Sequence, residues 1–250
     1  MRGVLDVDSF TANLLREYAR RYETADFIVG DPSWFMHQVK GDRNREMMAF
    51  MAAALSYGAR SQFLPKIQWL LDCSEGEPDL WVREGEYESV LREDDPACFY
   101  RLYTKGLMAR FLGACRELLL RYGSLGEFIP ADEAIKALEA LCGWFSSRGL
   151  AVIVPKDTTS SCKRLCMFMR WMVRDNSPVD LGLWAQKIDK RSLIMPLDTH
   201  VLTEAGKLGL VQSRCASMSS ARRLTATLSE VFPDDPLKGD FALFGYGVNQ

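Results

Sequence analysis

Apolar side chains recur along most of this chain at the three- and four-residue spacing that places them on one face of an α-helix. The pattern predicts helices over about 8–22, 32–39, 43–58, 60–72, 97–122, 131–147, 161–174, 198–208, 217–231 and 238–247. The positions of glycines, which often end helices, agree with these ranges, because Gly58, Gly123 and Gly209 fall where the helices should end. The chain is therefore predicted to be all-α.

The segments between the helices carry weaker signals. Residues 150–154 form the only β-like run, which we interpret as a short extended link and not as a strand in a sheet. Segment 74–96 is acidic and is predicted to be a loop, and 176–192 reads as an irregular insertion. No internal repeat is visible, so one folded unit or two lobes are expected.

Composition narrows the class of protein without naming an activity. With 250 residues, of which 48% are hydrophobic, the chain can bury a substantial core. It has no apolar run of the ~18 residues that a membrane span needs, and its first residues do not resemble a signal peptide. We therefore expect a cytoplasmic protein without a membrane partner.

The cysteines and histidines do not suggest a metal cofactor. Seven cysteines are scattered without a C-x-x-C pair or a tight four-cysteine run, and there are only two histidines. We therefore expect reduced thiols, no metal cluster and no cofactor.

The overall charge argues against nucleic-acid binding as a bulk property. The formal net charge is −2, and the isoelectric point is near 5.8. Any nucleic-acid contact would need a local basic face.

Lys163 opens the most informative helix. At about 100° per residue, Arg170 and Arg174 fall within about 20° of Lys163, so the helix is expected to present a basic line. The hydroxyl and amide groups of 157–161 precede it, and a helix N-terminus suits a phosphate. The alternative is a solvated basic stripe without a specific role.

An amine and a carboxylate at two helix starts suggest a chemistry. An amine attacks an electrophilic carbon only when neutral, and both the helix N-terminus and Arg164 favour the neutral form. Asp198 is predicted to cap the helix over 198–208, where N–H groups keep a carboxylate ionised and able to stabilise a cationic sugar. Alternatively, Asp198 is only a cap, worth about 1 kcal/mol.

These segments resemble a known superfamily. Ser160-Ser161-Cys162-Lys163, followed later by Pro196-Leu197-Asp198-Thr199-His200-Val201, is similar to the helix-hairpin-helix DNA glycosylases, which include endonuclease III and the 8-oxoguanine glycosylases. The resemblance implies a two-lobed helical bundle with Lys163 as nucleophile and Asp198 as the catalytic carboxylate. Residues 51–60 look like the loop that faces DNA in that superfamily, and 240–247 look like a helix that closes the same lobe.

The resemblance also implies a domain organisation and a partner. We expect one two-lobed unit over 1–250, with a first lobe over about 43–160, a second over 161–250, and 1–42 packing on the second. DNA is the implied partner, while the sequence leaves the oligomeric state unknown. The residues expected to contact nucleic acid are Tyr57, Arg60, Ser160, Ser161, Arg164, Arg170 and Arg174.

Three further residues are candidates for a pocket around an extruded base: Trp171, Trp184 and His200. Each candidate has a structural alternative. An arginine can simply be solvated, Tyr57 can pack on a neighbouring helix, Trp184 can act as a hydrophobic plug, and His200 can be a structural histidine.

The sequence departs from the superfamily in three ways. The hairpin glycines are replaced by Thr158-Thr159-Ser160-Ser161, which makes a turn with positive φ harder to form. Lys163 and Asp198 lie 35 positions apart, more than in endonuclease III, and the iron–sulfur cysteines are missing. More closely, residues 163–184 resemble a bacterial family of unknown function, which implies no activity.

These observations leave three alternative functions. The first is a DNA base-excision glycosylase with AP lyase activity; the second is a non-catalytic nucleic-acid-binding protein; the third is a different function on the same fold.

Overall fold

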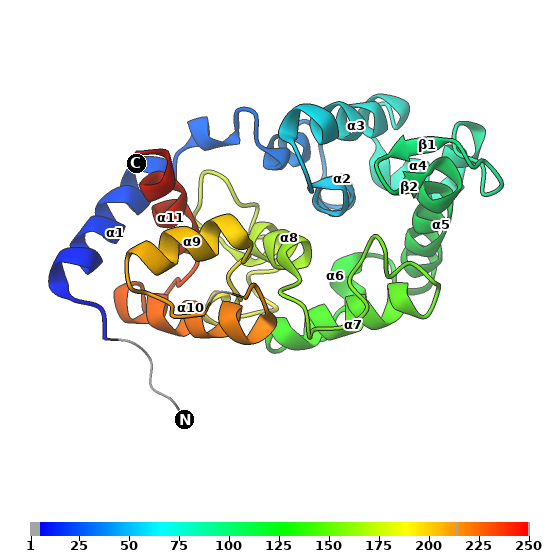
Figure 1. Cartoon of the computed structure of the whole chain (residues 1–250). Helices are drawn as coiled ribbons and strands as arrows, with labels where there is room; N and C mark the ends of the chain where they lie inside the picture. The colour runs from blue at the N-terminus through cyan, green and yellow to red at the C-terminus, as the bar shows by residue number, and fades with distance from the viewer. Residues whose placement is uncertain (1–5, 214, 250) are drawn as a thin grey trace. The chain divides into compact units, whose positions relative to one another are not determined.

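A computed structural model describes residues 6–213 and 215–249, and its chain divides into two compact units (Figure 1). Unit 1 combines Met1–Phe27, Ala131–Leu138 and Thr158–Gln250. Unit 2 combines Ile28–Pro130 and Glu139–Asp157. Both units are built from helices, so the prediction of an all-α protein is confirmed.

Unit 1 brings the N-terminal helix against the C-terminal one. Its helices are α1 (Ser9–Tyr22), the start of α7 (Ala134–Ser146), α8 (Lys163–Val173), η4 (Lys190–Ser192), α9 (Thr199–Lys207), α10 (Met218–Val231) and α11 (Lys238–Val248). Helix α1 packs along α11, and α9 also contacts α11 (Figure 1). Between α1 and α11, the Tyr22 ring contacts the Phe244 ring edge-on at 5.7 Å.

Unit 2 is organised around one hydrophobic helix. Its elements are η2 (Pro32–His37), α2 (Asp42–Leu55), α3 (Arg60–Cys73), α4 (Pro78–Glu84), η3 (Glu86–Ser89), β1 (Cys98–Tyr100), β2 (Tyr103–Thr104), α5 (Lys105–Tyr122), α6 (Leu125–Phe128) and the rest of α7; η1 (Ala25–Ile28) leads into it. Every residue of α2 from Glu46 to Leu55 is buried, as expected for a helix covered on all sides. Helix α2 contacts η2, α3 and α4.

The structure corrects the sequence prediction in the segment before α5. Residues 98–104 form a short antiparallel pair, with Cys98 opposite Thr104 and Tyr100 opposite Tyr103, where a helix from 97 was predicted. Helix α5 begins only at Lys105, because the Thr104 side chain caps it by accepting a hydrogen bond from the Leu107 N–H at 3.0 Å.

Two other segments also differ from the prediction. The segment predicted as a loop over 74–96 contains α4, which starts at Pro78, buries Trp81 and Val82, and ends at the left-handed Gly85. Residues 150–154 are not a strand, as predicted, but 151–153 form a turn where an extended link was expected. Within residues 6–213 and 215–249, no helix has both the length and the apolar character that crossing a membrane requires.

Candidate active site

Lys163 and Asp198 meet in unit 1. The Lys163 Nζ atom lies 2.7 Å from Asp198 Oδ2, and the two side chains are 39% and 33% exposed. An ion pair thus joins two residues that lie 35 positions apart in the chain, and a ligand can reach both from solvent.

A left-handed residue sets the position of Lys163. Cys162, the cap of α8, has φ of 48° and is buried, and Lys163 is the first helical residue. A non-glycine residue in this conformation costs about 1 kcal/mol. The residue with positive φ is thus Cys162, directly before the lysine, whereas none of residues 158–161, which replace the hairpin glycines, has a positive φ.

Asp198 serves two groups at once. Its Oδ1 atom accepts a hydrogen bond from the Val201 N–H at 2.8 Å and so caps α9, while Oδ2 faces Lys163. Partial burial favours the neutral acid, but the Lys163 ammonium and the Val201 N–H outweigh it and lower the pKa of Asp198 below its ordinary value. The carboxylate therefore stays ionised at neutral pH.

Arg170 of α8 and Arg174, the residue at its C-cap, do not lie on a solvated face. Arg170 is 4% exposed and Arg174 is not exposed at all. They form a buried ion-pair network, which consists of Glu23, Arg170, Arg174, Asp180, Asp235 and Asp240. The expected basic line along the helix is therefore corrected: only Lys163 of the three remains open to solvent, and a phosphate has no access to the guanidinium of Arg174.

The start of α8 carries the other residues predicted there. Ser160 is exposed, Ser161 and Arg164 are half-buried, and the Ser160 backbone forms a bridge with Ser217. Ser217 caps α10 by accepting a hydrogen bond from the Ser220 N–H. The first turns of α8 and α10 thus begin from one short backbone bridge.

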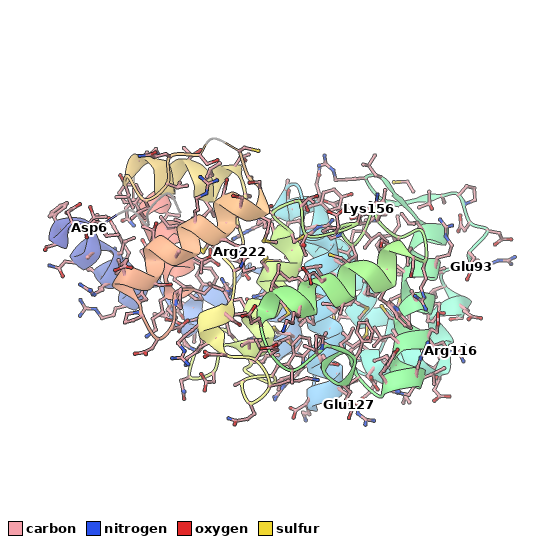
Figure 2. All side chains as sticks on the ribbon, turned by 90° about the horizontal axis from the view of Figure 1, so that it is seen from below. Asp6, Glu93, Arg116, Glu127, Lys156 and Arg222 are labelled. Carbon is pink, nitrogen blue, oxygen red and sulfur yellow. The ribbon has the colours of Figure 1, made fainter. Side chains whose placement is uncertain are left out.

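Helix α10 adds exposed basic side chains to this unit. Arg222, which Figure 2 labels on α10, and Arg223 are both exposed. Together with Lys163 and Arg164 they are cationic groups from two helices that start at the same bridge.

The three residues predicted to line a base pocket differ in how far they are buried. Trp171 is fully buried, and Trp184 is 5% exposed and packs edge-on against Phe168 with ring centroids 5.2 Å apart. Trp184 therefore has the packing of a hydrophobic plug. His200 is exposed in the first turn of α9, two residues after Asp198.

In unit 2, Tyr57 belongs to an aromatic cluster. Its ring lies 5.0 Å from that of Tyr100 and 5.2 Å from that of Tyr103, and the Arg101 guanidinium lies 5.5 Å from its centroid. Gly58 has φ of 83°, and a Cβ there would come within 2.8 Å of the Arg101 side chain. Glycine is therefore needed where the chain passes the cluster.

Arg60 begins α3 and pairs with Asp31. The Arg60 guanidinium lies 3.4 Å from the carboxylate, and its side chain remains 52% exposed. It can therefore still make a contact with solvent or with a ligand.

Sequence reasoning missed the tip of the β1–β2 hairpin. Leu102 is 79% exposed there, next to Arg101, whose φ is 51°. The sequence feature that could have indicated the hairpin is the run Tyr100-Arg101-Leu102-Tyr103, in which two aromatic residues flank a polar and an apolar one. Assigning all of 97–122 to one helix obscured it.

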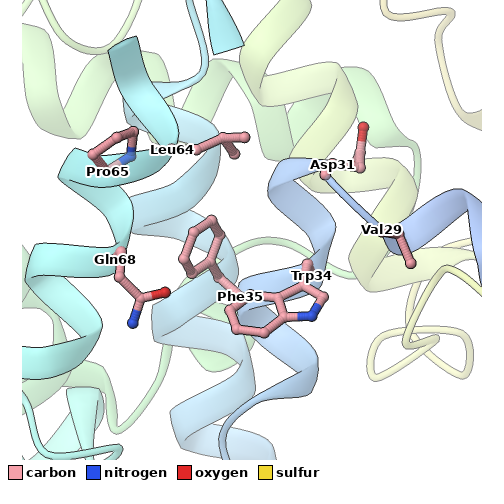
Figure 3. A pocket seen from close by; sticks show the side chains of 8 residues that line it. Val29, Asp31, Trp34, Phe35, Leu64, Pro65 and Gln68 are labelled. Carbon is pink, nitrogen blue, oxygen red and sulfur yellow. The ribbon is translucent and has the colours of Figure 1, made fainter. Parts of the chain in front are cut away.

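Unit 2 also contains a pocket of about 310 Å³ (Figure 3). It is lined by Val29, Gly30, Asp31, Trp34, Phe35, Leu64, Pro65 and Gln68. Its carboxylate, Asp31, already accepts hydrogen bonds from the Ser33 N–H and hydroxyl and pairs with Arg60. The pocket is thus mainly apolar, and its one charged group has protein partners.

Across the part of the chain that the structure describes, no group of three or more His, Cys, Asp or Glu side chains is arranged to hold a metal ion. Comparison with known proteins gives one match: the family described as "Protein of unknown function (DUF2400)" matches residues 31–249. No curated protein and no solved structure matches the chain.

Proposed function

Because the chain belongs to the DUF2400 family, whose description assigns no function, we propose an activity from the site itself: DNA base excision by a glycosylase with AP lyase activity. The observation that carries this proposal is the accessible pair of Lys163 Nζ and Asp198 Oδ2 at 2.7 Å. A primary amine beside an ionised carboxylate is the pair of groups that this chemistry needs.

The proposed reaction uses the amine as the nucleophile. The neutral Lys163 amine attacks the anomeric carbon of the deoxyribose, and the bond from that carbon to the base breaks with its electron pair leaving on the base. Asp198 stabilises the positive charge that develops on the sugar. Proton loss and opening of the sugar ring then give a Schiff base, from which elimination of the 3′ phosphate cleaves the strand.

The ion pair imposes one condition on this chemistry. In the free protein the Lys163 nitrogen faces a carboxylate at 2.7 Å, so its lone pair is not available for attack. A sugar must come between the two groups, and a proton must leave the nitrogen, before the new bond forms. Binding of DNA is therefore part of the activation of the amine.

DNA contacts are proposed on both units. In unit 1, Ser160, Ser161 and Arg164 lie at the start of α8, and a helix N-terminus suits a phosphate. In unit 2, Arg60 is accessible, and Leu102 projects beside Arg101. An exposed leucine on a turn is the type of side chain that wedges between base steps and favours extrusion of a nucleotide.

Borohydride trapping tests the proposal. Duplex oligonucleotides that carry an abasic site or one of a panel of damaged bases are incubated with the protein and borohydride, which reduces a Schiff base to a stable adduct. We expect an adduct with the wild type, none with Lys163→Ala, and a rate about 100-fold lower with Asp198→Asn, because one electrostatic contact to the transition state is lost. Lys207→Ala is the matched control, since Lys207 is 45% exposed and also pairs with an acid, Glu204.

The outcomes separate the three functions. Loss of the adduct in both Lys163→Ala and Lys207→Ala would contradict the assigned nucleophile. Binding to DNA that weakens steeply with salt, with no adduct on any oligonucleotide, would indicate the non-catalytic binding protein. Neither binding nor an adduct would leave a different function on this fold.

A further inference from the structure

The pocket of about 310 Å³ in unit 2 lies between η2 and α3, and we call it the η2–α3 pocket (Figure 3). The segment before η2, η2 itself and α3 contribute its lining. Phe35 is buried, whereas Trp34 and Leu64 are half-buried. Phe35 therefore closes the pocket toward the core, and a ligand can reach the other walls from solvent.

The η2 side of the pocket is aromatic. The rings of Trp34 and Phe35 meet edge-on, with centroids 5.1 Å apart and planes at 90°. A flat ring that lies against the face of one of them meets the edge of the other, and aromatic rings favour both arrangements. This side of the pocket therefore suits a planar aromatic group.

Two polar groups of the pocket can still bind a ligand. Gln68 donates from Nε2 to Asp72 at 2.7 Å, which leaves its carbonyl oxygen as an acceptor. Within residues 6–213 and 215–249, the indole N–H of Trp34 donates to no other group. Nucleobases carry both donors and acceptors on their edges, so a donor and an acceptor here match them.

The charge that the pocket offers to a ligand is positive. Asp31 is 11% exposed and accepts hydrogen bonds from the Ser33 N–H and hydroxyl at 3.0 and 2.7 Å. Its other oxygen pairs with Arg60, whose side chain is 52% exposed. A ligand therefore meets the guanidinium and not the carboxylate, and a guanidinium binds phosphate with two parallel hydrogen bonds. Charge complementarity favours an anion.

Helix α3 sets the spacing of the groups on its side. Arg60, Leu64 and Gln68 follow one another at intervals of four residues, so they lie along one face of the helix. One such interval corresponds to roughly 6 Å along the helix axis. The cation and the apolar wall are thus separated by a short distance, as the phosphate and the base of a nucleotide are separated by the sugar.

We propose that the η2–α3 pocket binds a nucleotide, free or as one unit of a single strand. The base lies against Trp34 with its edge toward Gln68, and the phosphate pairs with Arg60. Stacking on an aromatic ring tolerates every base, because each base has a π face. This inference goes beyond the proposed function, since it assigns to unit 2 a second site that holds a nucleotide without reacting with it.

Isothermal titration calorimetry of the full chain with adenosine 5′-monophosphate tests the site. We expect binding to wild type and about 10-fold weaker binding to Trp34→Ala, because the stacking of one base is lost. Arg60→Ala should weaken the monophosphate by about 10-fold but adenosine by less than about twofold, because only the monophosphate carries the group that the guanidinium contacts.

Matched variants separate these effects from a loss of folding, which circular dichroism also checks. Trp34→Phe keeps an aromatic face and should bind within about threefold of wild type. Trp69→Ala and Arg92→Ala are the controls and should bind as wild type does. Trp69 is a half-buried tryptophan of α3 that contacts Phe99, and Arg92 is an exposed arginine that pairs with Asp94.

A single-stranded hexadeoxyadenylate distinguishes the two sources of the nucleotide. Competition between this oligonucleotide and adenosine 5′-monophosphate in wild type, weakened for both by Trp34→Ala, would assign the site to a nucleotide within a strand. Binding of the monophosphate without competition would assign it to a free nucleotide. Both results support a nucleotide site.

Three results would overturn the inference. They are no binding of adenosine 5′-monophosphate, binding of inorganic phosphate as tight as that of the monophosphate, or equal binding by Trp34→Ala and its control Trp69→Ala. These measurements involve neither Lys163 nor a damaged base. A missing borohydride adduct would therefore count against the proposed function alone.

Discussion

At the scale of single residues, the carboxylate of Asp198 has two partners, a backbone N–H group and an ammonium group. One oxygen caps α9 through the Val201 N–H, and the other faces the Lys163 ammonium. Of the two interpretations that the sequence allowed for this aspartate, the cap is confirmed, while the catalytic role stays a prediction that the contact with Lys163 supports. A cap fixes the direction of the carboxylate without any additional group.

The lowered pKa of Asp198 leads to a prediction about acid stability. A carboxyl group whose pKa is lower in the folded than in the unfolded state contributes stability above its ordinary value of 3.8, and that contribution is lost as the pH falls through the folded-state value. We therefore expect wild type to exceed Asp198→Asn in free energy of unfolding at about pH 6, and the difference to shrink by about pH 3. Urea denaturation of both proteins at each pH measures it, and a difference independent of pH would contradict the assignment.

At the scale of elements, α8 shows what periodicity can and cannot predict. The spacing predicted that Lys163, Arg170 and Arg174 share one face, and the two arginines do pair with the same carboxylate, that of Asp180. It could not show what covers that face, because the partners Asp235 and Glu23 lie 61 and 151 positions from Arg174. Lys163, at the N-terminal end of this face, remains exposed, and only this end is available for a ligand.

Removal of Arg174 should be costly. In Arg174→Ala, three buried or nearly buried carboxylates lose their main partner, so we expect the free energy of unfolding to fall by about 3–5 kcal/mol. Arg191→Ala is the control: its side chain is 64% exposed and pairs with Asp189, and exposed pairs contribute at most about 1 kcal/mol. Equal losses in the two variants, measured by urea denaturation, would show that the network does not hold unit 1 together.

At the scale of the whole molecule, the sequence predicted the helical class and most helix positions, and the structure brings its two principal site residues together. It did not predict the β1–β2 hairpin, since Phe99, Tyr100 and Tyr103 fit the apolar spacing of a helix as well as that of a strand. Two lobes were expected from the resemblance, but the exact segments of each unit lie far apart in the chain, and local patterns do not specify them. Local patterns specify elements, but non-local contacts decide which elements belong together.

The exposed leucine at the tip of the β1–β2 hairpin gives a test of the DNA contacts proposed for unit 2. We expect Leu102→Ala to slow adduct formation on duplex abasic DNA by about 10-fold, because a wedge that offsets the cost of unstacking is lost. On a single-stranded abasic oligonucleotide, where little unstacking is needed, the rate should change by less than about twofold. Leu120→Ala, at another exposed leucine, is the control, and equal effects on both substrates would remove the wedge from the proposal.

The hydrogen bond from Arg174 to Glu23, with the packing of α1 on α11, has a consequence for biosynthesis. During translation, α1 is synthesised long before α11 (Lys238–Val248), the helix that covers it. Unit 2 needs nothing beyond Asp157 and is complete about 90 residues earlier. We expect α1 to stay uncovered until α11 has been made, so that unit 1 closes only after all segments of unit 2 have been synthesised.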